Sequence, residues 1–263
     1  MQAALLSPRS TVHFAGACRR AFHGLRSGYP HYLPGIASTW FFTEVVSQAV
    51  PGPRAVAAPL LFFLSAVYYA AGAARTAGRF PTRNVIMLGV ERSSSFLSMF
   101  GLLIAALGLG ALLVGVPAIA AGTELLVGVG MAVWAALLGL GFLRFWPTPA
   151  IAFHFQGRIR WSPSGRGSLW VGPGLGAAWR LTSRIGTVRR ASLPLAGLVL
   201  LVGGGWLAGR LLADLSGFAL FAFNAAFFAG ALPFLYGLVD DLTGQLRAAI
   251  PEAEVDVAKD STR

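Results

Sequence analysis

The chain has 263 residues, of which 56% are hydrophobic and 12% are charged, and its mean hydropathy is +0.67. A soluble domain carries about a quarter of its residues charged, so this composition predicts an integral membrane protein. The long apolar runs exclude a disordered chain, and the lack of a three-residue glycine period excludes a collagen. The single cysteine, Cys18, excludes a disulfide framework.

Charge is divided unevenly between the body of the chain and its C-terminal end. Residues 1–239 carry eighteen arginines and no lysine against four acidic residues, a net charge of +14, whereas residues 240–263 have a net charge of −3. Basic residues beside apolar segments orient a membrane protein and face anionic lipid. Because no basic stretch interleaves aromatic residues on a soluble fold, we expect membrane lipids and no nucleic acid as partners.

The first segment, 1–26, is expected to form a basic amphipathic helix. At 100° per residue its apolar face would carry Phe14, Ala17, Cys18, Ala21, Phe22 and Leu25. No acidic residue precedes Glu44, as in transit peptides. The run 19–23, Arg-Arg-Ala-Phe-His, resembles the sites where mitochondrial presequences are cut. We favour a presequence that is removed; a helix retained at the surface of a bacterial membrane and a plastid transit peptide are the alternatives.

The next segment, 27–54, is expected to lie at the membrane interface. Within it, residues 32–50 are largely apolar but contain Pro34, Glu44 and Gln48. These residues predict an interfacial or re-entrant segment, and a complete crossing of the bilayer is the alternative.

Five segments are long and apolar enough to cross a membrane. A bilayer core about 30 Å thick requires roughly twenty apolar residues as a helix. The membrane domain, 55–239, provides such segments at 55–74, 94–116, 122–145, 192–212 and 217–239. Short turns at Pro117 and at 214–217 pair four of them into hairpins. The predicted fold is therefore an all-α bundle of about five transmembrane helices.

The arginines predict which ends of the spans face the cytoplasm or matrix. They concentrate after the first span, at Arg75, Arg79, Arg83 and Arg92, and after the third, at Arg158, Arg160, Arg166, Arg180, Arg184, Arg189 and Arg190. Five spans would put both loops on one face and the arginines of segment 1–26 on the other. Either segment 1–26 is removed, which we favour, or residues 32–50 cross.

The polar loop 146–191 is expected to form a small basic β-hairpin at the membrane surface. Apolar residues alternate with small or polar ones over 151–155 and over 158–161, and this period of two predicts strands. Residues 162–167 have turn composition, and 168–171 can form the returning strand. The acidic segment 240–263 is expected to be a solvated tail.

The sequence carries no motif for catalysis, cofactor binding or metal binding. All four histidines lie outside the spans, so a transmembrane haem or metal centre would lack ligands. We expect no cofactor and no enzymatic activity, with a membrane enzyme acting on lipid as a minor alternative. Polar side chains at membrane depth are costly and often functional. The candidates for an ion path or a buried polar role are Glu124, Arg210, Asp214 and Asn224.

The segment 210–217 resembles the arginine-bearing helix of the rotary ATP synthase a subunit over eight residues, Arg-Leu-Leu-Ala-Asp-Leu-Ser-Gly. In that family the arginine-leucine pair is followed by an asparagine, whereas this chain has Asp214, and it lacks the family's glutamine-bearing final helix. The resemblance therefore implies no function for this chain.

Small residues recur four positions apart along the spans. The pairs are Gly101/Ala105, Ala106/Gly110, Gly128/Ala132, Ala135/Gly139 and Gly205/Gly209. This spacing lets helices approach closely, either within the chain or against other membrane-protein subunits. Contact surfaces without active-site chemistry favour a non-enzymatic structural or assembly subunit of an inner-membrane protein complex. The alternative is a transporter or an ion or proton channel component. The mitochondrial inner membrane is the favoured location, and the bacterial cytoplasmic membrane is the alternative.

Overall fold

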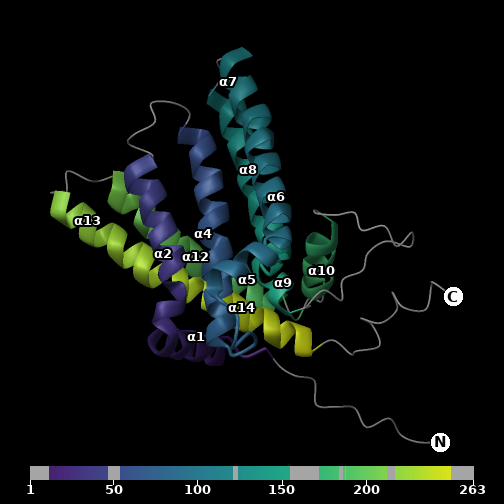
Figure 1. The fold of residues 1–263 in the computed structure, drawn as a ribbon. Helices are drawn as coiled ribbons and strands as arrows, with labels where there is room; N and C mark the ends of the chain where they lie inside the picture. Colours follow the sequence, from purple (N-terminus) through teal and green to yellow (C-terminus); the bar gives the residue numbers. More distant parts are fainter. Residues whose placement is uncertain are drawn as a thin grey trace, which may run out of the picture.

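A computed structural model describes residues 12–46, 54–120, 124–154, 172–183, 186, 188–211 and 217–249. Every regular element within these ranges is helical, and none of them is a strand. The helical bundle is thus confirmed in part, whereas the β-hairpin predicted in the loop 146–191 is absent where that loop is described. Figure 1 shows helices that project from a common end, where α1, α5, α9 and the end of α14 lie. We call this the basal end and define it by two sets of ion-paired residues: Arg79 and His154 with Asp240, and Arg20 with Asp241.

The N-terminal helix α1 (Phe14–Gly28) packs against α14. It is amphipathic, as predicted, and Ala17 and Ala21 are buried in the contact. Phe22, which belongs to the predicted apolar face, is 63% exposed. The chain continues through η1 (Tyr29–Tyr32), α2 (Leu33–Trp40) and the π-helical η2 (Phe41–Val46), and α2 runs along α4 away from the basal end (Figure 1).

Helix α4 (Arg54–Thr76) is the centre of the molecule. It contacts α1, α2, α5, α6, α9 and α14, and the described part of it buries Ala66, Val67, Tyr69, Ala70, Ala71, Ala73 and Ala74. Small side chains allow this crowding: a Cβ atom on Gly72 would lie 2.7 Å from the backbone oxygen of His31. A short loop leads to α5 (Val85–Glu91), where Asn84 caps the first turn by accepting a hydrogen bond from the Ile86 backbone nitrogen at 2.8 Å.

The second and third predicted spans form a long hairpin. Its first arm is α6 (Ser94–Gly110), the π-helical η3 (Ala111–Gly115) and α7 (Val116–Ala120), and its second arm is α8 (Glu124–Phe145). Figure 1 shows the hairpin extending away from the rest of the molecule to its tip at α7. Pro117 was predicted to end the first arm, but the helix continues past it to Ala120.

The predicted β-hairpin is wrong where the structure describes it. Residues Thr148–His154 form the helix α9, which buries Ile151 and Phe153 together with Thr148, Pro149 and Ala150. A short apolar run cannot distinguish a strand from a buried helix by its period alone, and here the neighbours on α4, α6 and α14 favour the helix. The rest of the expected hairpin, 155–171, lies outside the described residues. Helix α10 (Gly172–Thr182) follows and packs on α8 and α9.

The last two predicted spans form a second hairpin. It consists of η4 (Val188–Ser192) and α12 (Leu193–Leu211), followed by α13 (Gly217–Ala226), η5 (Phe227–Ala231) and α14 (Leu232–Ala248). Helix α14 extends nine residues beyond Val239 and buries Asp240, Leu242, Thr243 and Leu246. The acidic tail was therefore predicted to begin too early; residues 250–263 lie outside the described chain.

Three π-helical segments precede prolines. Segments η3, η4 and η5 each end two residues before Pro117, Pro194 or Pro233. Proline removes the hydrogen bond to the carbonyl four residues earlier, and a π turn accommodates that loss. Ala229 is the residue four before Pro233, and its carbonyl accepts a hydrogen bond from the Tyr29 hydroxyl at 3.0 Å. The π segment before Pro233 is thus tied to the N-terminal part of the chain.

Four helical stretches of the described chain are long and apolar enough to cross a membrane. They are Met99–Ile119, Glu124–His154, Val188–Trp206 and Phe221–Ala248, and they overlap four of the five predicted spans. An integral membrane protein is therefore supported. The remaining predicted span, 55–74, is helical as α4, and its crossing of a bilayer stays a prediction.

Candidate functional site

The most concentrated charge of the described chain lies at the basal end, around Asp240. This residue is 4% exposed on α14, and its carboxylate is paired with the Arg79 guanidinium from the loop after α4. The His154 ring at the end of α9 lies on its other side, with Nε2 2.9 Å from the Asp240 backbone oxygen and 3.2 Å from Oδ1. A buried carboxylate thus joins three segments that are distant in the sequence.

A second ion pair lies one residue further along α14. The Arg20 side chain on α1 donates two hydrogen bonds to the Asp241 carboxylate, from Nε at 2.7 Å and from Nη2 at 2.9 Å. Gln245 donates to the same carboxylate at 2.7 Å and accepts a bond from the His13 backbone nitrogen at 2.9 Å. The two adjacent aspartates therefore have different partners, since neighbours on a helix do not face each other, and cannot act on one substrate together.

The Arg20–Asp241 pair also affects titration on α1. Its hydrogen bond to Asp241 raises the pKa of the Arg20 guanidinium, which stays charged. The half-buried Cys18 thiol has a raised pKa because burial disfavours the thiolate and because the Asp241 charge repels it. The lone cysteine is therefore poorly activated as a nucleophile.

The polar residues singled out for an ion path do not gather in one place. Glu124 is exposed at the start of α8, beside the tip of the first hairpin, whereas Asn224 is buried on α13 in the second (Figure 1). The Asn224 side chain accepts a hydrogen bond from the Trp206 indole nitrogen at 3.2 Å. The backbone of Arg210 lies in the last turn of α12, while Asp214 lies outside the described residues. Asp240 was not among the candidates named from the sequence, because the apolar span that precedes it was predicted to end at Val239.

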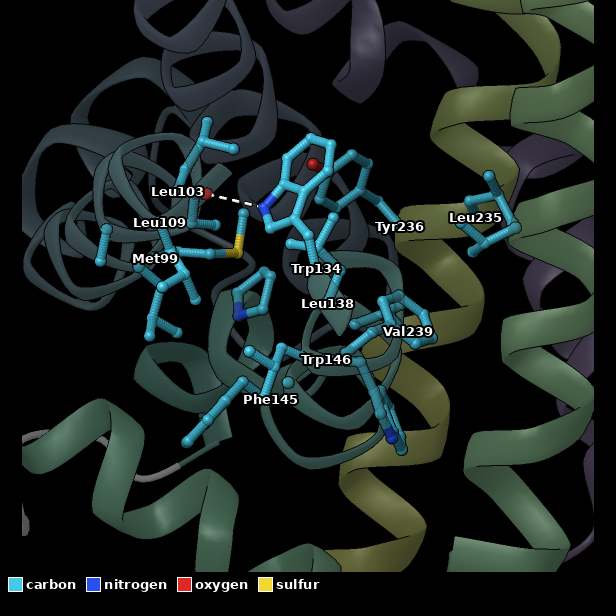
Figure 2. Close-up of a pocket in the computed structure, with 18 of the residues that line it drawn as sticks. Met99, Leu103, Leu109, Trp134, Leu138, Phe145, Trp146, Leu235, Tyr236 and Val239 are labelled. Carbon is cyan, nitrogen blue, oxygen red and sulfur yellow. Dashed lines mark hydrogen bonds between the residues drawn. The ribbon is translucent and has the colours of Figure 1, made fainter. Parts of the chain in front are cut away.

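An apolar cavity of about 620 Å³ lies between the two hairpins. Figure 2 shows side chains from α6, α8 and α14 converging on it. Its walls are formed mainly by aliphatic and aromatic residues, among them Leu103, Leu109, Trp134, Leu138, Phe145, Trp146, Leu235, Tyr236 and Val239. The lining positions on α8 recur three and four residues apart, which places them on one face of that helix.

The indole groups that line the cavity are already hydrogen-bonded to the protein. Trp134 donates from Nε1 to the Ala106 carbonyl at 2.9 Å, drawn as the dashed line in Figure 2, and Trp146 donates to the Ser192 hydroxyl at 2.7 Å. Pairing of these donors inside the wall leaves an interior suited to hydrocarbon. Among the described residues, no three histidine, cysteine or acidic side chains are grouped so that they could hold a metal ion.

A different face of α8 carries the small residues noted in the sequence. Four of them are exposed and follow one line along the helix: Gly128, Ala132, Ala135 and Gly139. A Cβ atom added at Gly128 or Gly139 would have no neighbour within 4 Å. By contrast, one added at Gly110 would lie 2.7 Å from the Trp134 ring. Some of the predicted small pairs therefore pack inside the chain, whereas the α8 line faces outward.

No protein-family model matches this chain, and no curated protein or solved structure is similar to it.

Proposed function

We propose that the chain is a non-enzymatic structural or assembly subunit of a protein complex in an inner membrane. The observation that carries the proposal is the outward line of small residues on α8, Gly128, Ala132, Ala135 and Gly139. Membrane helices associate where small residues let their backbones approach closely. The line lies on a candidate span and faces away from the rest of the described chain, so it fits a helix of another subunit.

The charges of the basal end fit the same role. Asp240 and Asp241 are engaged by Arg79, His154 and Arg20 from other segments of the chain. Such pairs fix the positions of helices, because breaking one would leave a buried charge without its partner. We infer that this network holds the fold while the first hairpin presents its outer face.

Affinity purification of the tagged chain from its native membrane in mild detergent tests the proposal. We expect stoichiometric co-purification of other membrane proteins, and its loss in the double variant Gly128→Leu/Gly139→Leu, whose side chains would occupy the outward face. Gly141→Leu is the matched control, since residue 141 lies on the cavity side of the same helix. A wild-type chain that purifies without partner proteins would contradict the proposal.

The contacts of α1 help to choose between the two candidate membranes. Cleavage near residue 20 would remove the partner of Asp241 and uncover the surface of α14 that α1 now covers. This supports a retained surface helix, so we propose the bacterial cytoplasmic membrane over the mitochondrial inner membrane. Intact-mass measurement of the native protein tests this: a mature chain that begins after residue 20 would restore the presequence interpretation.

We further propose that residues 32–50 cross the membrane. With α1 retained at the basal end, α2 leads away from that end and α4 returns to the basic loop that contains Arg79 (Figure 1). The arginines of α1 and of that loop then lie on one face, in accordance with the positive-inside rule. A cysteine introduced at Arg26 and one at Arg83 should both be shielded from an impermeant thiol reagent in intact cells; labelling of one alone would contradict this topology.

A transporter or an ion or proton channel component is the second candidate, and the buried Asp240 cluster is the observation that favours it. A buried carboxylate beside a histidine is a common proton site in membrane proteins. Flux measurements in proteoliposomes distinguish the two functions. A transporter would show flux that Asp240→Asn abolishes while the protein stays folded, whereas the subunit alone would show none.

A further inference from the structure

The cavity between the hairpins lies at membrane depth and is bounded by candidate spans. Its walls come from α6, α8, α9, α12 and α14, and each of these helices belongs to a stretch long and apolar enough to cross a bilayer. Whatever fills the cavity therefore comes from the hydrocarbon region of the membrane. An apolar occupant is favoured, because aliphatic and aromatic side chains form nearly all of the walls and the indole donors of Trp134 and Trp146 are already paired.

The cavity is open on one side. Its lining residues Leu109, Leu137 and Leu138 are 36%, 43% and 40% exposed, so an occupant enters from the surrounding membrane. A single acyl chain, which is narrow and flexible, fits a volume of about 620 Å³. A helix of another subunit lying along the open side is the other occupant, and the experiment below distinguishes the two.

Positive charge lies close to one end of the cavity. The lining residue Trp146 is bonded to the Ser192 hydroxyl at 2.7 Å, and Ser192 ends the segment η4, in which Arg189 and Arg190 are exposed. A third arginine nearby, Arg144, is already engaged, because it donates to the Thr182 carbonyl at 2.6 Å and lies over the Trp179 ring. The exposed pair is thus placed to meet a phosphate at the membrane surface.

We propose that the cavity binds an acyl chain of an anionic phospholipid, whose headgroup phosphate is held by Arg189 and Arg190. The apolar walls accept the chain, and the arginines select the headgroup. This site is independent of the proposed association through the outer face of α8, because the two surfaces lie on different sides of that helix.

Gly141 provides a variant that fills the cavity without disturbing its walls. It lines the cavity, and a Cβ atom added there would have no neighbour within 4 Å. Gly139 also has open space around it, but it lies two residues away and therefore about 200° around the helix. Gly141→Leu and Gly139→Leu thus add the same side chain to one helix, inside and outside the cavity.

Native mass spectrometry of the delipidated chain, incubated with equal amounts of dioleoyl phosphatidylglycerol and dioleoyl phosphatidylcholine, tests the proposal. We expect one retained lipid per wild-type chain and about a tenfold preference for phosphatidylglycerol. Gly139→Leu should behave as wild type, and Gly141→Leu should lose about tenfold in retention of both lipids. Arg189→Gln/Arg190→Gln should retain lipid but lose the headgroup preference.

Several results would overturn the proposal. These are equal retention of the two lipids by the wild-type chain, and equal behaviour of the two leucine variants. If Gly141→Leu abolishes partner co-purification and leaves lipid retention unchanged, the cavity belongs to a partner helix. If Gly141→Leu fails to fold, the variant Arg189→Gln/Arg190→Gln still tests the proposal. Both arginine side chains are exposed, so their replacement should leave the fold intact. Failure of the subunit proposal is recognised separately, by the absence of co-purifying proteins with the wild-type chain.

Discussion

The basal end and the first hairpin are stabilised in different ways. At the basal end, α1, α9 and α14 and the loop after α4 are joined by ion pairs, and Asp240 is almost completely buried. Along the hairpin of α6 and α8, large apolar side chains remain uncovered, and Ile119 near its tip is 90% exposed. The comparison indicates that the described chain itself covers the basal end, whereas it leaves the apolar side chains of the hairpin exposed.

The largest expected effect comes from removing the buried charge of the basal end. Asp240→Ala leaves the Arg79 guanidinium without its carboxylate, and breaking a buried pair in this way costs about 3 kcal/mol or more. We expect a large fall in the thermal unfolding temperature of the protein in detergent. Glu91→Ala is the control, because the Arg83–Glu91 pair is 48% and 42% exposed and such pairs contribute about 1 kcal/mol or less. Equal effects of the two variants would remove the distinction between a buried and an exposed ion pair.

The next effect tests how tightly the two arms of the first hairpin are packed. A Cβ atom on Gly130 would lie 1.9 Å from the Leu113 backbone oxygen, so Gly130→Ala forces the arms apart at a cost of about 1–3 kcal/mol. The measurement is again the thermal unfolding temperature. Gly128→Ala, on the outward face, should be neutral or slightly stabilising because alanine is the better helix former. If both variants behave alike, the arms are less closely packed than the structure indicates.

A smaller effect is expected at the solvent-facing side of the basal end. Arg20→Gln removes the bidentate pair with Asp241, but the Arg20 side chain is 56% exposed, so solvent screening limits the loss to about 1 kcal/mol or less. Urea unfolding should show a slightly lower midpoint with an unchanged slope. A loss of stability as large as that of Asp240→Ala would mean that the contact of α1 contributes more to the stability of the fold than the exposure of Arg20 suggests.

The smallest effect concerns the reactivity of Cys18. Burial and the Asp241 charge raise the pKa of its thiol, so at any given pH less thiolate is present than in an unfolded chain, and modification by a maleimide should be slower. The reaction rate should begin to rise at a higher pH than it does for a free cysteine. Asp241→Asn removes the repelling charge and should accelerate the reaction modestly, whereas Glu91→Gln should not. An unchanged rate in Asp241→Asn would leave burial as the sole cause.

The long apolar helices could be predicted from the sequence, because their length and hydropathy are local properties. The assignments that failed depend on distant partners. Residues 151–154 are helical because α9 is buried among α4, α6 and α14, and Asp240 lies inside the fold because Arg79, 161 residues earlier, pairs with it. Neither of these tertiary contacts affects the local periodicity of apolar residues, so neither could be predicted from it. The cavity could not be predicted either, since its walls come from five helices that only the tertiary structure brings together.

The contacts of α1 have a consequence for the biogenesis of the protein. Arg20 and Asp241 are separated by 221 residues, and the bond from Tyr29 to the Ala229 carbonyl spans 200 residues. Chains are synthesised from the N-terminus at about 5–20 residues per second, so α1 leaves the ribosome roughly ten seconds or more before α14 exists. Helix α1 is therefore synthesised well before it can dock on α14, and in the interval its apolar face can bind the membrane surface.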